Sequence, residues 1–127
     1  MKIAFALRIP LVGTFCAILC ACASYPRSGS EAVAGSWTNA LGTVWMLNSN
    51  GTFDVDLNHD GKRDAWGTFT TERDIITLTG TGGAAPKGCK GNGIYRFDRG
   101  RDTLRFHLVH DKCTLRVKNV MLVWHRR

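Results

Sequence analysis

Residues 43–57 have the sequence TVWMLNSNGTFDVDL, an apolar segment and an alternating segment joined by Asn-Ser-Asn-Gly. In segment 52–57 the apolar Phe53, Val55 and Leu57 alternate with polar residues. A period of two indicates a β-strand with one buried face. Asparagine followed by glycine is typical of a tight hairpin turn. The stretch therefore predicts an antiparallel hairpin.

The same alternation recurs on both sides of this hairpin, between turn signals such as Asp60-Gly61 and Glu72-Arg73. No later segment shows a sustained helical stripe, so the fold class is predicted to be all-β. The expected strands are a short piece around Trp37 and residues 43–47, 52–57, 65–70, 74–79, 93–97, 103–108 and 120–125. Eight antiparallel strands with short connections suit a small up-and-down β-barrel, since closure removes exposed strand edges. A sandwich is the alternative.

The N-terminal segment has the order of features expected of an export signal. Lys2 and Arg8 precede an apolar run over residues 9–19, which is too short to span a membrane. The run ends in Leu-Cys-Ala-Cys, which resembles the lipobox of bacterial lipoproteins, with Cys22 as the lipidated residue. An ordinary secretory signal is the alternative. The resemblance implies a diacylated, palmitate-type anchor in the cell envelope. Because Ala23 is not aspartate, it also implies the outer membrane, facing the periplasm.

Three parts of the chain follow from this interpretation. Residues 1–21 are the lipoprotein signal peptide, residues 22–33 are the lipidated cysteine with a polar, flexible tether, and residues 34–127 form one domain. After cleavage, Cys89 and Cys113 remain besides the anchor. An even pair of cysteines in an oxidising compartment predicts one disulfide.

Charge is unevenly distributed along the chain. After Pro86 there are eleven lysines and arginines against three acidic residues. Such a basic region attracts lipid headgroups or anionic glycans, although a solvated surface gives the same composition. The export signal excludes nucleic acid as a partner.

A family resemblance rests on Gly35-Ser36-Trp37, which is similar to the Gly-x-Trp motif of lipocalins. In that family an arginine near the last strand packs on the tryptophan, and here Arg126 or Arg127 follows Trp124. The wider pattern is similar to small lipocalin-like bacterial lipoproteins of unassigned function. The resemblance implies a structural motif of Gly35, Trp37, Trp124 and Arg126.

The same resemblance implies a small apolar or amphipathic ligand, held at the barrel mouth near residues 80–88. The domain is shorter than a full lipocalin and lacks the second family signature, Thr-Asp-x-x-Tyr. Side chains can fill the interior of a barrel of eight strands. The residues expected to face inward include the aromatic Trp37, Phe53, Phe69, Phe106 and Trp124, with Leu104 and Leu108. Sequence therefore leaves open whether this barrel is hollow or filled.

The loop DLNHDGKRD places Asp56, Asn58, Asp60 and Asp64 at positions 1, 3, 5 and 9, with glycine at position 6. Alternate oxygen-bearing side chains around a glycine are typical of an EF-hand-type calcium loop. Position 12 is Gly67 instead of glutamate, and no helices flank the loop. A polar hairpin tip is therefore favoured over a calcium site.

No catalytic motif joins the four histidines to a nucleophile. The sequence favours a non-catalytic binding module, without a cofactor unless the loop binds calcium. Two rivals remain: an inhibitor-type barrel that binds another envelope protein, and a calcium-dependent envelope module.

Overall fold

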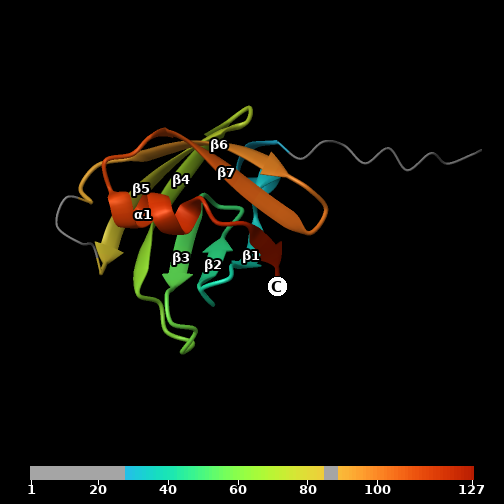
Figure 1. Cartoon of the computed structure of the whole chain (residues 1–127). Coiled ribbons are helices and arrows are strands. Elements are labelled where there is room, and N and C mark those ends of the chain that lie inside the picture. Colours follow the sequence, from blue (N-terminus) through green and yellow to red (C-terminus); the bar gives the residue numbers. More distant parts are fainter. Residues whose placement is uncertain (1–27, 85–88) are drawn as a thin grey trace, which may run out of the picture.

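The structure, a computed structural model, describes residues 28–84 and 89–127, so the predicted signal peptide and Cys22 lie outside it. Within the described residues, each strand pairs antiparallel with the next and β8 closes the barrel on β1 (Figure 1). The predicted eight-stranded up-and-down barrel is confirmed. Its elements are η1 (Gly29–Ala32), β1 (Gly35–Thr38), β2 (Val44–Leu47), β3 (Thr52–Asp56), β4 (Ala65–Glu72), β5 (Ile75–Gly83), β6 (Gly93–Arg99), β7 (Thr103–His110), α1 (Thr114–Val120) and β8 (Trp124–Arg126).

The expected last strand over 120–125 is wrong in its first half. The chain forms α1 over Thr114–Val120, and β8 begins only at Trp124. The Cys113 sulfur accepts a hydrogen bond from the Arg116 amide at 3.4 Å and caps the start of α1. A short apolar run such as 120–124 is compatible with a strand or with a buried helix end. Tertiary contacts of α1 select the helix here.

The strand expected over residues 74–79 is longer, because β5 continues to Gly83 and stays paired with β4 across a register shift between Trp66 and Gly67. Gly82 pairs with Trp66, and a β-carbon at Gly82 would overlap the Trp66 ring. Only glycine lets this tryptophan lie across the neighbouring strand. The glycines therefore serve close packing between strands.

The two ends of the barrel differ in their connections. The turns after β2, β4 and β6 lie at one end, called the opposite end, with the last residues of β8. The β1–β2 turn, the β3–β4 loop and α1 lie at the other, called the α1 end. Figure 1 shows α1, in orange-red, running across β3 and β5.

Aromatic and aliphatic side chains from all eight strands form one core cluster inside the barrel. The five aromatic residues expected to face inward are all buried: Trp37, Phe53, Phe69, Phe106 and Trp124. Leu108, expected inward with Leu104, is 45% exposed, so that prediction is wrong. It lies near the end of β7, where the pairing with β6 is irregular.

Candidate functional site: an apolar cavity beneath α1

A cavity of about 640 Å³ occupies the barrel at the α1 end. Its volume is within the range of about 300–1,000 Å³ usual for small-molecule sites. Most of its lining is apolar, and Arg116 and Asn119 of α1 add polar groups. The apolar side chains that line it are those of Trp45, Phe53, Val55, Leu57, Ala65, Trp66, Leu78, Ala84, Leu115, Val120 and Trp124. The barrel is therefore filled toward one end and hollow toward the other.

Glycines make room for the cavity on β4 and β5. Gly80 follows Ile76 and Leu78 at the strand period, so it is on the inward face, and it lines the cavity. A β-carbon at Gly80 would meet nothing within 4 Å. Its partner across the ladder is Gly67, where a side chain would overlap Phe53. A larger residue at position 80 would occupy the space that this pair leaves open.

Trp45 on β2 supplies a polar group to this apolar wall. It packs against Phe106 and Trp124, with ring centroids 5.3 and 5.1 Å away, and is 3% exposed. Its indole nitrogen is buried and has no acceptor among the described residues. A buried N–H without an acceptor costs about 1–3 kcal/mol, so a ligand oxygen placed there would be favourable.

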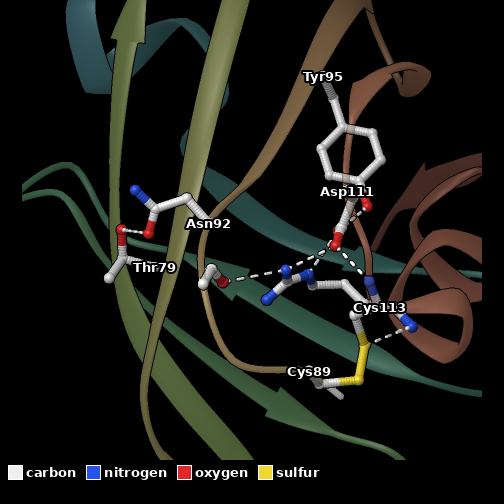
Figure 2. Close-up of polar contacts among 8 residues, drawn as sticks. Thr79, Cys89, Asn92, Tyr95, Asp111 and Cys113 are labelled. Carbon is white, nitrogen blue, oxygen red and sulfur yellow. Dashed lines mark hydrogen bonds and ion pairs between the residues drawn. A yellow bond between two sulfur atoms is a disulfide. The ribbon is translucent and has the colours of Figure 1, made fainter.

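The Asp111 carboxylate holds α1 onto the barrel through a set of hydrogen bonds. Its side chain is fully buried, and Arg116 donates to both oxygens, from Nε at 2.6 Å and from a terminal nitrogen at 2.7 Å. The Tyr95 hydroxyl and the Cys113 amide donate to the same carboxylate. Figure 2 shows Asp111 between Tyr95 of β6 and the disulfide. Bidentate arginine–carboxylate pairs are among the stronger polar contacts in proteins.

The pKa values of these groups follow from the network. Desolvation raises the pKa of Asp111, but the hydrogen bonds from Arg116, Tyr95 and the Cys113 amide outweigh it and lower the pKa below its ordinary value. Desolvation and the hydrogen bond to Asp111 raise the pKa of Tyr95. The hydrogen bond to Asp111 raises the pKa of Arg116. The ionised acid and base therefore fix the start of α1.

The Cys89–Cys113 disulfide is present, as the sequence predicts, and both cysteines line the cavity. It joins the segment before β6 to the residue that caps α1. At its other end, α1 is held by Asn119, which accepts from the Asn39 amide at 2.6 Å and donates to Thr43 at 3.4 Å. The helix is therefore attached at both ends across the α1 end of the barrel.

The loop over residues 56–64, considered from the sequence as a calcium site but favoured as a polar hairpin tip, is an exposed turn in which the acidic side chains accept backbone hydrogens. Asp56 accepts from the Gly61 amide at 2.8 Å, and Asp64 accepts from Leu57 at 2.7 Å. Desolvation raises the pKa of Asp56, but backbone hydrogen bonds and nearby His59 lower it overall. Asn58 and Asp60 accept in the same way within the loop. Among residues 28–84 and 89–127, no group of three His, Cys, Asp or Glu residues is arranged to hold a metal ion.

The lipocalin-like motif residues come together near the opposite end. The Arg126 guanidinium lies 5.1 Å from the centre of the Trp37 ring, and Arg99, not anticipated from the sequence, lies 5.0 Å from it. Gly35 has a φ of 147°, and a β-carbon there would lie 3.3 Å from the Trp37 indole nitrogen. Trp124 lines the cavity instead. Gly35, Trp37 and Arg126 therefore pack together in the filled half of the barrel, whereas Trp124 lines the hollow half.

No protein-family model, curated protein or solved structure matches this chain. Within the part of the chain that the structure describes, no helix is long and apolar enough to cross a bilayer.

Proposed function

We propose that the protein is a non-catalytic binding module that holds a small apolar or amphipathic molecule in the cavity beneath α1. The observation that carries the proposal is the apolar cavity of about 640 Å³, walled by three tryptophans and left open by Gly80. An empty apolar cavity costs stability because its lining loses dispersion contacts, which a bound apolar molecule would restore.

The chemistry of the lining narrows the ligand class. Apolar carbon surrounds most of the space, and the unpaired Trp45 indole N–H calls for an acceptor oxygen. Arg116 lines the cavity but is already paired with Asp111, so its charge is largely neutralised there. The ligand that fits is a hydrocarbon or aromatic body with an oxygen acceptor, such as a hydroxyl, carbonyl or carboxyl group.

The proposal includes the cellular setting inferred from the N-terminal sequence. A chain anchored through a lipid on Cys22 would present the barrel in the periplasm, attached to the outer membrane. An oxidising compartment is consistent with the disulfide beside the cavity. The Cys22→Ser form, exported behind an ordinary cleavable signal in place of residues 1–21, should be released from membranes; membrane retention equal to that of the wild type would contradict this setting.

Tryptophan fluorescence tests the binding function directly. Three of the four tryptophans, Trp45, Trp66 and Trp124, line the cavity, so occupancy should change the emission. Dodecanol and dodecane serve as probes with and without an acceptor oxygen. Saturable changes with dodecanol are expected, and Trp45→Phe should weaken its affinity about fivefold, the worth of one hydrogen bond of about 1 kcal/mol. Dodecane, which has no acceptor oxygen, should bind the wild-type and Trp45→Phe proteins with equal affinity. No saturable change with either probe would refute the function.

A further inference from the structure

Exposed apolar side chains are concentrated at the α1 end. Of the large hydrophobic residues exposed in the described parts of the chain, Met46 lies on the barrel wall, on β2, and the others lie at or near the α1 end. Leu41 of the β1–β2 turn is 69% exposed, and Leu115 of α1 is 58% exposed. Met121, just after α1, is 43% exposed. Leu115 also lines the cavity, so this concentration extends to the cavity mouth.

These residues belong to segments that hydrogen bonds and the disulfide hold together. Asn119 of α1 is hydrogen-bonded to Asn39 and Thr43, which lie on either side of Leu41 in the β1–β2 turn. The disulfide fixes the other end of α1 to Cys89. The polypeptide positions of Leu41, Leu115 and Met121 are therefore set by contacts already formed in the structure.

Positive charge accompanies the apolar side chains. Lys90, Lys112 and Lys118 are exposed, and they belong to the segments that the disulfide and α1 bring together. Asp111, the acidic residue beside them, is buried and paired with Arg116. The two other acidic residues between positions 89 and 123 are Asp98 on β6 and Asp102 in the turn after it, and both lie toward the opposite end.

The β3–β4 loop at the same end carries a small net negative charge. Asp56, Asp60 and Asp64 outnumber Lys62 and Arg63 there by one. The region around α1 is therefore the basic part of this end.

We propose that this mouth surface, defined as Leu41, Lys90, Lys112, Leu115, Lys118 and Met121, docks the barrel onto an anionic lipid surface. Apolar side chains that enter the headgroup layer gain from burial, and lysines beside them gain from negative lipid charge. Lysine can lie along apolar groups while its ammonium stays among headgroups. Lysine is depleted in protein–protein interfaces, so the composition favours lipid over a protein partner. Docking in this orientation places the cavity mouth against the membrane.

Vesicle co-sedimentation of residues 28–127 tests the proposal, because this segment contains all eight strands and the core. Phosphatidylcholine vesicles with and without one third phosphatidylglycerol are the probes, with no cavity ligand added. We expect binding to the anionic vesicles that weakens as salt is raised. Lys112→Ala with Lys118→Ala should weaken it about 25-fold, since each lysine near an anionic surface is worth about fivefold.

Matched controls separate docking from general charge and hydrophobicity. Leu115→Glu should weaken vesicle binding at least tenfold, whereas Met46→Glu, which changes an exposed apolar residue on the barrel wall, should leave it within twofold. Arg101→Ala with Arg127→Ala removes equal charge at the opposite end and should have a smaller effect than the lysine pair. Circular dichroism confirms that each variant is folded.

Absence of binding to anionic vesicles, or equal losses in the mouth-surface and control variants, would overturn the docking proposal. Binding of dodecanol without vesicles is a separate measurement. The cavity function and the docking surface can therefore fail independently.

Discussion

Replacement of Gly80 by leucine should fill the cavity and stabilise the barrel while blocking ligand binding. Gly80 faces the cavity, and a β-carbon there meets no atom within 4 Å. Burial of a leucine side chain is worth about 1.5–3 kcal/mol when complete. Because the cavity is open at the α1 end, the new side chain is buried only in part, and we expect about half of that burial free energy. Removal of a strand glycine adds roughly 0.5–1 kcal/mol.

The expected net gain is therefore about 1.3–2.5 kcal/mol, which raises the melting temperature by roughly 4–8 °C per kcal/mol in a domain of this size. Dodecanol affinity should fall at least tenfold, because the new side chain occupies the ligand volume. Thermal unfolding followed by circular dichroism and fluorescence titration give the two readings.

Two neighbouring glycines are matched controls for Gly80→Leu. Gly82→Ala should lower the melting temperature, because its β-carbon would overlap Trp66. Gly67→Ala should do the same through overlap with Phe53 and the Thr79 carbonyl. A Gly80→Leu variant that is destabilised as much as these two, or that binds dodecanol with unchanged affinity, would refute the assignment of Gly80 to open cavity space.

Three further predictions concern the attachment of α1 and the β3–β4 loop. Cys89→Ser with Cys113→Ser should cost about 2–4 kcal/mol of unfolding free energy in urea denaturation, since the disulfide closes a loop with a sequence separation of 24; a loss below about 0.5 kcal/mol would contradict this. Asp111→Ala should cost about 3 kcal/mol because it leaves Arg116 half-buried without its partner. The pKa of Asp111 is lowered in the folded state, so its contribution is complete above the unfolded pKa near 4 and is lost as pH falls further; the stability difference between wild-type and Asp111→Ala proteins should therefore shrink as pH falls below about 4, and a difference that stays constant would contradict this. Calcium at millimolar concentration should leave the melting temperature unchanged, because the loop carboxylates already accept backbone hydrogens; a rise that Asp60→Ala abolishes would establish a calcium site.

The sequence predicted the strand order well because alternation and turn signals are local properties. Phe53 and Phe106 were placed inward by their alternation with polar neighbours, and both are buried. The disulfide followed from the count of cysteines in a compartment inferred from the signal. These features need no knowledge of distant contacts.

The cavity and α1 could not be predicted because they depend on contacts between distant residues. The helix spans seven residues, too few for a clear helical period, and is held by Asn39 and Cys89. The space beside Gly80 exists because it pairs with Gly67 across the ladder, in a register that sequence does not give. Trp45 has the same inward pattern as the core aromatics, and only the structure shows its unpaired indole N–H beside a cavity.

Native mass spectrometry of the exported chain, purified from periplasm as the Cys22→Ser form, tests the central claim most directly. The binding function predicts a retained organic mass of a few hundred daltons, of the size that a pocket of about 640 Å³ accepts, and its loss in Gly80→Leu. A bare protein mass that also takes up neither dodecanol nor dodecane when these are added would contradict the account.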